Sequence, residues 1–187
     1  MSTMVHLCSS LLTAAVLSVS AGGMATANVC ALHATEAELE YRIPAGLLQA
    51  IAQVESRYNP WAIALGGRSV LPGTQEEAAR VVRSRPARGI FVGCMQLSVK
   101  HHGWAFDDKV DMLDPAENVD YAAQLLVELR DASGSWTKAV QRYQGGTPVA
   151  QRRYVCKVAG ELRRINRTSA DLFDTRACSA KERRITS

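Results

Sequence analysis

The sequence predicts a mainly helical domain with a small β lobe inserted between its helices. Apolar residues recur at helical spacing in the segments before residue 57 and after residue 114, and a glycine pair flanked by short apolar runs lies between them. The composition, 47% hydrophobic and 21% charged, is ordinary for a soluble globular protein. At 187 residues the chain is long enough for one domain with a substantial core.

The first predicted element is an amphipathic helix from Pro44 to about Arg57. Proline is favoured in the first turn of a helix, and Asn59-Pro60 supplies the stop signal. Four apolar residues at three-to-four spacing give the helix one buried face: Leu47, Leu48, Ile51 and Val54.

A β-hairpin is predicted next, because Gly66-Gly67 separates the apolar segments 61–65 and 69–71. Thr74 and Glu77 then have the spacing of a capping box, which predicts a short helix through residue 82.

The remainder of the chain is predicted to be helical, beginning after an Arg-rich loop at residues 84–89. Asp114-Pro115 followed by Glu117 is a strong helix start, and Gly145-Gly146 is a strong stop. The predicted helices are a buried one over 94–101, a long one from 114 to about 132, one over 136–143 and a last one over 148–165.

The N-terminal residues are typical of an export signal. A short apolar run over 11–19 is followed by Ala25-Thr26-Ala27, whose small side chains suit cleavage before Asn28. The run is too short to span a bilayer, and His6 stands where Lys or Arg is usual. We therefore expect a signal peptide over residues 1–27, a folded domain over 28–166, a basic tail over 167–187 and a periplasmic location.

Four cysteines remain after the expected cleavage, and in an oxidising compartment they permit two disulfides. Their spacing leaves all three pairings open and contains no CxxC or Cys/His zinc motif. The candidates are Cys30, Cys94, Cys156 and Cys178.

Positive charge is concentrated near the C-terminus, with ten Lys/Arg against four Asp/Glu from residue 151 onward. Such a segment suits an anionic surface such as the cell wall, a membrane or nucleic acid, but a solvated polar face is the interpretation we favour, and no nucleic-acid partner is expected.

Glu55 is the one charged residue on the apolar face of the first predicted helix. It follows Ile51 by four residues and Leu48 by seven, so its side chain shares their face. Burial and the negative end of the helix dipole both disfavour a carboxylate there, so the pKa of Glu55 should be raised. A raised pKa suits a general acid near neutral pH. Taken alone, the position is more typical of a glutamate at the edge of the apolar face that points to water.

Downstream motifs decide between these interpretations. From Ile43 onward the chain contains, in order, IPAGLLQAIAQVESRYNP, VGCMQLSVKHHG, DPAENVDYAAQLLVEL and AVQRYQGG. This succession, over about residues 30–158, resembles the soluble lytic transglycosylase (SLT) family of the lysozyme-like superfamily. The hairpin and the segment after it look closest to small members linked to flagella, pili and secretion machines.

The resemblance implies an α+β lysozyme-like fold and a role for individual residues. Glu55 matches the catalytic acid/base, and Ser56 matches the neighbour that helps hold the sugar. Met95 and Gln96 match the pair lining the glycan groove. Tyr143 matches the tyrosine that hydrogen-bonds near the catalytic carboxyl and orients it. Asn118 matches a helix position that we take as structural.

Two departures from the family pattern are visible. Gln144 follows the tyrosine where asparagine is usual, and Cys94 stands where leucine is common, with Cys30 as its candidate partner in this subgroup. The adjacent His101 and His102 point in different directions on a helix and have no obvious third ligand, so no metal or other cofactor is expected. His102 is expected to support the loop near the groove.

The resemblance further implies cleavage of the bond between N-acetylmuramic acid and N-acetylglucosamine to a 1,6-anhydromuramyl product. The segment 61–73 contains no Asp or Glu, which fits a mechanism with one carboxylate. Peptidoglycan glycan strands are the expected substrate of a monomer that opens the wall for a flagellar, pilus, conjugation or secretion apparatus. The alternatives are a hydrolytic muramidase, a non-catalytic peptidoglycan-binding assembly module and, least favoured, an unrelated small disulfide-linked secreted domain.

Overall fold

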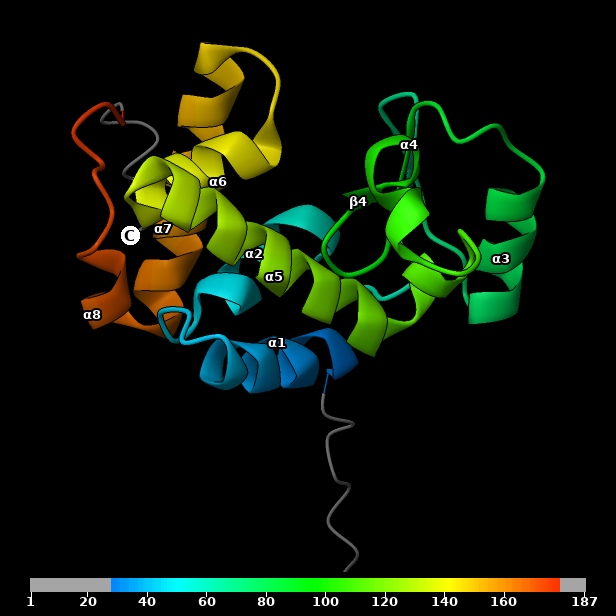
Figure 1. Ribbon diagram of the computed structural model, residues 1–187, viewed down its shortest axis with the longest axis horizontal. Coiled ribbons are helices and arrows are strands. Elements are labelled where there is room, and N and C mark those ends of the chain that lie inside the picture. Colours follow the sequence, from blue (N-terminus) through cyan, green and yellow to red (C-terminus); the bar gives the residue numbers. More distant parts are fainter. Residues whose placement is uncertain (1–27, 179–187) are drawn as a thin grey trace, which may run out of the picture.

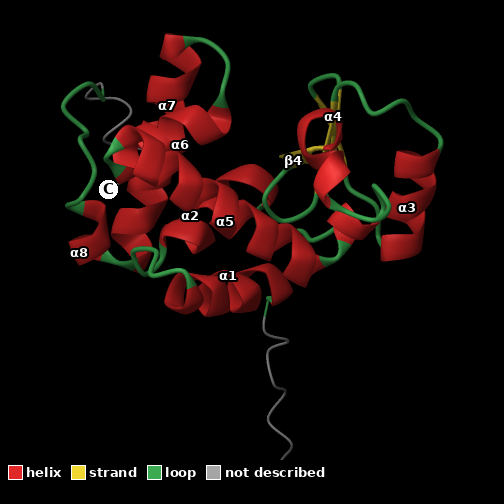
Figure 2. Ribbon diagram, viewed as in Figure 1, coloured by secondary structure: helices red, strands yellow, loops and turns green. Residues whose placement is uncertain are grey.

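The computed structural model describes residues 28–178, which form a helical lobe and a small β lobe (Figure 1). Within this described part of the chain, strands occur only at one end (Figure 2). The predicted class, mainly α with a minor β lobe, is confirmed. The helices are α1 (Val29–Glu40), α2 (Leu47–Ser56), α3 (Gln75–Arg83), α4 (Val99–His102), α5 (Pro115–Ser133), α6 (Trp136–Gln144), α7 (Pro148–Ile165) and α8 (Arg167–Ala170), with short 3-10 turns η1 (Gly103–Ala105) and η2 (Asp111–Leu113).

Helix α2 lies in the middle of the helical lobe, in contact with α1 and α7, while α5 packs against α1 and α6. Leu47, Leu48 and Ile51 are fully buried, as their predicted spacing requires. Burial of each such side chain stabilises the fold by roughly 1.5–3 kcal/mol. The apolar face therefore fixes the orientation of α2 and, with it, the position of its last turn.

The start of α2 differs from the prediction. The helix begins at Leu47 and not at Pro44, because Gly46 has a φ of 88°, outside the helical range. A Cβ at this glycine would lie 2.8 Å from Cγ2 of Ile165, so α7 and the chain entering α2 approach closely here.

The β lobe contains one antiparallel sheet with the strand order β2-β1-β3-β4. The predicted hairpin is confirmed, with Ile63 of β1 opposite Val70 of β2, and the other edge of β1 pairs with β3. The third and fourth strands have no counterpart in the predicted elements. The strands are β1 (Ile63–Leu65), β2 (Arg68–Val70), β3 (Ile90–Val92) and β4 (Leu97–Ser98).

The single buried helix predicted over residues 94–101 is wrong. A turn follows Gly93, strand β4 comes next, and only Val99–His102 is helical. Gly93 has a φ of 82° and Gln96 a φ of 50°, and left-handed residues at this spacing are incompatible with a continuous helix.

Both lobes meet at the buried side chain of Asn118 on α5. Its Oδ1 accepts a hydrogen bond from the backbone N–H of Met95 at 2.9 Å, and its Nδ2 donates to the carbonyls of Val92 and Met112 at 3.1 and 2.8 Å. The structural role predicted for Asn118 is thus confirmed. Gly93 leaves the room for it, since a Cβ there would lie 2.3 Å from Nδ2 of Asn118.

Two disulfides link distant parts of the chain. Cys30 at the start of α1 is bonded to Cys94 in the turn after β3, the pairing that the resemblance implied. Cys156 of α7 is bonded to Cys178. Since Phe173 and Cys178 are buried, the segment 167–178, expected to begin a separate tail, packs against the domain.

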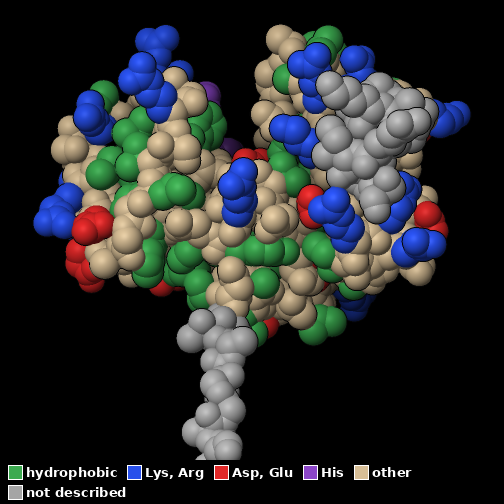
Figure 3. All heavy atoms as spheres, turned by 180° about the vertical axis from the view of Figure 1, so that it is seen from behind, with side chains coloured by type: hydrophobic (Ala, Val, Ile, Leu, Met, Phe, Trp, Pro, Cys, Tyr) green, Lys and Arg blue, Asp and Glu red, His purple; other side chains and the backbone are tan. Residues whose placement is uncertain are grey.

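A cleft separates the two lobes on the side seen from behind, with acidic and histidine side chains in its floor and Lys and Arg on its rims (Figure 3). Within residues 28–178, no helix has the length and apolar character needed to cross a bilayer. The expected signal peptide over 1–27 lies outside the described residues.

Candidate active site

Glu55 lies in the last turn of α2, on the same side as the buried residues of that helix. Its side chain is half-buried, whereas Leu48 and Ile51 are fully buried. The carboxyl group is therefore removed from bulk water but still reachable from solvent, which is the environment a proton-transferring group requires.

The pKa of Glu55 is raised from 4.5 to about 7, mainly because burial disfavours the charged form. A hydrogen bond from Tyr154 and the positive charge of Lys157 act in the opposite direction and keep the value from rising further. This result confirms the predicted direction. Near pH 7 both the acid and the carboxylate are populated, so the same group can give a proton and take one back.

Tyr154 is the functional residue that the sequence analysis missed. Its hydroxyl donates to Oε1 of Glu55 at 2.5 Å, across 99 positions of sequence. The pattern of α7 predicts only that Tyr154 faces inward with Val155 and Val158. A polar hydroxyl on that apolar face was the available signal, because a buried tyrosine usually finds a hydrogen-bond partner.

Tyr143, expected to bond near the catalytic carboxyl, has a different partner. Its hydroxyl donates to the backbone carbonyl of Met95 at 2.8 Å. Burial and the neighbouring charge of Glu55 hold its pKa well above 10, so Tyr143 is a neutral donor close to the site. The prediction is corrected in this respect: Tyr154 orients Glu55, and Tyr143 fixes the turn beside it.

The side chain of Met95 does not line a groove as expected, since it is fully buried. Its backbone N–H and carbonyl are held by Asn118 and Tyr143 respectively. The Met95-Gln96 segment therefore forms a rigid turn, and the buried side chain of Met95 anchors that turn in the core.

Gln96 and Ser56 also bond to their own surroundings. The Nε2 of Gln96 donates to the carbonyls of Ala62 and Gly93 at 2.9 and 3.1 Å, which ties the turn to the start of the β lobe. The hydroxyl of Ser56, only 7% exposed, donates to the carbonyl of Ala52 at 3.1 Å. Ser56 can therefore accept a hydrogen bond from a sugar hydroxyl, but it can donate one only if this internal bond breaks.

His102, expected to support the loop near the groove, lies at the end of α4 and contacts Tyr121 of α5. Its Nδ1 lies 2.9 Å from the hydroxyl of Tyr121, and the two rings are 5.4 Å apart. Burial lowers the pKa of His102, which favours the neutral imidazole. Gln144 lies exposed at the end of α6. Among residues 28–178, no group of three His, Cys, Asp or Glu side chains is arranged to hold a metal ion.

The β lobe offers no acidic partner for Glu55 from its strands. The four described strands, IAL, RSV, IFV and LS, contain neither Asp nor Glu. Glu77, at the edge of this lobe, belongs to the capping box of α3, accepting from the N–H of Gly73 while its own N–H donates to Thr74. Within residues 28–178, the strands of the β lobe thus supply no second carboxyl group beside Glu55, the group that hydrolysis by a pair of carboxylates requires.

Comparison with known proteins identifies one family. The sequence profile of the transglycosylase SLT domain matches residues 33–158, which include α2, the sheet, α5 and the Tyr154 region of α7. Searches of curated proteins and of solved structures found no match.

Proposed function

Because the chain belongs to the SLT transglycosylase family, we propose that it cleaves the β-1,4 bond between N-acetylmuramic acid and N-acetylglucosamine, with Glu55 as its only acid/base. At the level of the family, the activity is of the lytic transglycosylase type, its substrate is peptidoglycan and its place of action is outside the cytoplasm. The observation that supports the assignment to Glu55 is its carboxyl group, with a pKa of about 7 and a single tyrosine donor at 2.5 Å.

The reaction needs two proton transfers. Protonated Glu55 gives its proton to the glycosidic oxygen as the bond to C1 of the muramic acid breaks. The N-acetyl oxygen of the substrate stabilises the positive charge that develops at C1. Glu55, now a carboxylate, takes the proton from the C6 hydroxyl as that oxygen bonds to C1. The product is a 1,6-anhydromuramyl end, and no water is consumed.

Tyr154 has a distinct part in each half of this cycle. Its hydrogen bond to Oε1 fixes the rotamer of Glu55, leaving Oε2 free to face the glycosidic oxygen. When Glu55 becomes ionised, the same hydroxyl stabilises the carboxylate by a charge-assisted hydrogen bond. The neighbouring Lys157 favours that ionised form as well.

We further propose that the enzyme is exported by a cleaved signal peptide, acts in the periplasm as a monomer and opens the wall locally for an envelope-spanning apparatus. Its small size and its likeness to flagellum-, pilus- and secretion-linked members support this role. Gln144, which replaces the usual asparagine, favours a second candidate, a wall-binding assembly module without turnover.

Incubation of the purified protein with peptidoglycan sacculi, followed by mass spectrometry of the released muropeptides, tests the proposal. Anhydromuramyl products that disappear with Glu55→Gln are expected. Reducing-end products would instead identify a hydrolase, and binding to sacculi without release would identify the assembly module. Turnover by Glu55→Gln at the wild-type rate would refute the assignment of the acid/base.

A further inference from the structure

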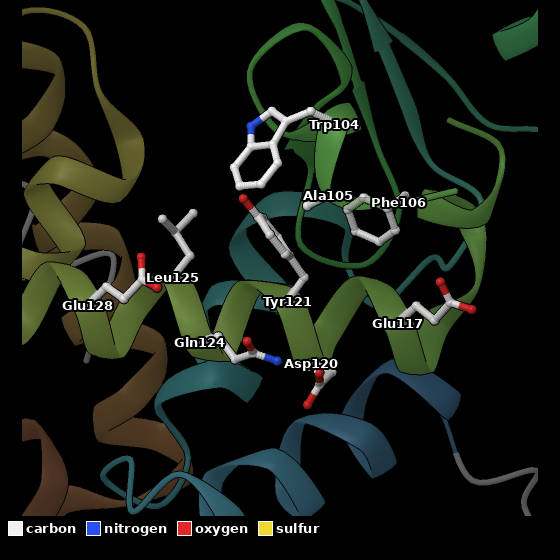
Figure 4. Close-up of a pocket in the computed structure, with 9 residues that line it drawn as sticks. All are labelled: Trp104, Ala105, Phe106, Glu117, Asp120, Tyr121, Gln124, Leu125 and Glu128. Carbon is white, nitrogen blue, oxygen red and sulfur yellow. Dashed lines mark hydrogen bonds between the residues drawn. The ribbon is translucent and has the colours of Figure 1, made fainter. Parts of the chain in front are cut away.

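A second hollow lies outside the Glu55 site, where the α4–η1 segment overhangs α5. It has a volume of about 460 Å³, within the range of small-ligand sites. Three aromatic residues line it, with Tyr121 rising from α5 towards Trp104, and Phe106 beside them (Figure 4).

This hollow, lined by Trp104, Phe106 and Tyr121, is called the groove below, and Trp104 is its most unusual residue. Its side chain is 81% exposed, the largest exposure of any big hydrophobic residue in the described part of the chain. The indole is nevertheless held in place, since its Nε1 donates to the carbonyl of His101 at 2.9 Å. A fixed, exposed aromatic ring has little conformational entropy to lose when it contacts a ligand.

The opposite wall is acidic. Glu117 and Glu128 lie at the two ends of the groove along α5, while the side chain of Asp120 points away from Trp104 (Figure 4). None of the described residues lining the groove is Lys or Arg. Asp120 is fixed by hydrogen bonds from Tyr41 at 2.6 Å and Gln124 at 2.7 Å. Glu117 and Glu128 are exposed, and neither is in an ion pair within residues 28–178. The groove is thus negative although the chain as a whole carries a net charge of +4.

The groove shares its supports with the Glu55 site. Tyr121 lies one turn after Asn118, whose amide holds Met95, and the carbonyl of Met95 in turn accepts from Tyr143. Glu55 and Tyr121 also both raise the pKa of Tyr143, so both lie within electrostatic reach of it. The groove and the turn beside Glu55 are thus supported by neighbouring residues of α5, Tyr121 and Asn118.

We propose that this groove binds a primary ammonium group carried by peptidoglycan, an inference that rests on the proposed function. An ammonium on an apolar or sugar body matches both walls, because its charge is attracted by the carboxylates and by the face of the indole. Peptidoglycan offers that chemistry from two sources: the diamino acid of a stem peptide, and a glucosamine whose acetyl group has been removed.

Calorimetric titration of the Glu55→Gln protein, which binds without turnover, tests the inference with two pairs of probes. The first pair is a disaccharide-tetrapeptide with a free diamino acid ammonium and the same compound N-acetylated at that amine. The second is a glucosamine tetramer and its fully N-acetylated counterpart. We expect the free amine of at least one pair to bind about five- to tenfold more tightly than its acetylated form, and less tightly as salt is added.

The variants Trp104→Ala and Glu128→Gln should each abolish most of that preference, and the pair that shows it identifies the source of the ammonium. Phe91→Ala and Asp171→Asn, which remove an exposed aromatic ring and an exposed carboxylate elsewhere, should leave it unchanged. Equal binding of free and acetylated forms in both pairs, or an undiminished preference in Trp104→Ala and Glu128→Gln, would overturn the inference. Either outcome is independent of the release assay, in which only Glu55 and the bond cleaved are tested.

Discussion

The side chain of Glu38, a residue of α1, caps the start of helix α2, whereas Glu55 lies in the last turn of α2, and the structure holds the two carboxyl groups differently. Glu38, 3% exposed, accepts hydrogen bonds from the N–H of Gly46 at 2.7 Å and from the N–H and side-chain amide of Gln49 at 3.1 and 3.2 Å. It thereby satisfies the positive end of the helix dipole. Glu55, at the negative end, has one side-chain donor.

Burial raises the pKa of both groups, yet only that of Glu55 is brought to about 7. At Glu38 four hydrogen bonds, from the N–H groups of Gly46, Leu48 and Gln49 and from the side-chain amide of Gln49, oppose the effect of burial, whereas at Glu55 one tyrosine and the charge of Lys157 do so. The comparison indicates that burial alone does not bring the pKa of a carboxyl group to about 7. The number of donors around it separates a structural carboxylate from an acid/base.

The largest effect expected from this difference is on turnover. Glu55→Gln keeps the shape of the side chain and removes its proton, so release of muropeptides should fall by about 10²–10⁴-fold. Glu38→Gln, made in parallel, should retain turnover in its folded fraction, because Glu38 faces backbone donors and not the cleft. An equal loss in a folded Glu38→Gln protein would contradict the comparison.

A second effect is on stability as a function of pH. The folded-state pKa of Glu55 is about 7 against 4.5 in the unfolded chain, so its ionisation opposes folding. Wild type should lose stability as the pH rises from about 4.5 through about 7, by at most about 3 kcal/mol. Glu55→Gln should lack this loss and be the more stable protein at pH 8. Urea unfolding at pH 4 and pH 8 would measure it, and a difference between the two proteins that does not grow with pH would contradict it.

Removal of the Glu38 carboxyl group should lower the stability of the protein, whereas Glu55→Gln should raise it at pH 8. Glu38→Ala leaves the N–H groups of Gly46 and Gln49 without their acceptor, which should cost about 1–3 kcal/mol in the free energy of unfolding. Its neighbour Glu40 is exposed, so Glu40→Ala should change stability by less than about 0.5 kcal/mol. Equal losses in the two variants would show that the cap of α2 contributes little.

The smallest effect is expected from changing Tyr154, whose hydroxyl donates a hydrogen bond to Glu55. Wild-type kcat/KM should fall as the pH rises above about 7, where Glu55 loses the proton it must give. Tyr154→Phe removes the hydrogen bond that lowers this pKa, so the falling limb should move to higher pH, with a rate loss of up to about tenfold. Tyr143→Phe breaks the bond to Met95 instead, and its falling limb should stay in place. If the falling limb of the kcat/KM profile moves to higher pH in Tyr143→Phe and not in Tyr154→Phe, then Tyr143 and not Tyr154 sets the pKa of Glu55.

Much of the helical lobe could be predicted because its signals are local. The stripe of Leu47, Leu48 and Ile51 predicts which face of α2 is buried, and Asp114-Pro115 marks the start of α5. The carboxyl group of Glu55 could be placed on that face for the same reason. Helix α1 was not predicted, since polar and apolar residues are poorly segregated along it and its anchor is a disulfide to a distant turn.

The rest of the site depends on contacts that no local pattern contains. Tyr154 meets Glu55 only when α7 packs on α2, so spacing along α7 indicates its burial and not its partner. The segment after Gly93 was predicted to be helical because its apolar residues have suitable spacing. Left-handed backbone at Gln96 is stabilised there by side-chain bonds to Ala62 and Gly93, which a sequence pattern does not encode.

The joint between Gly93 and Asn118 has a consequence for how this enzyme can vary. The terminal amide of Asn118 uses one acceptor and two donor bonds in three directions, and the space it fills is the absent side chain of Gly93. Aspartate has the same shape without the two donors, and glutamine is one methylene too long for the space. Any side chain at Gly93 would displace the amide. The two positions are therefore coupled, and a change at either should be tolerated only with a compensating change at the other.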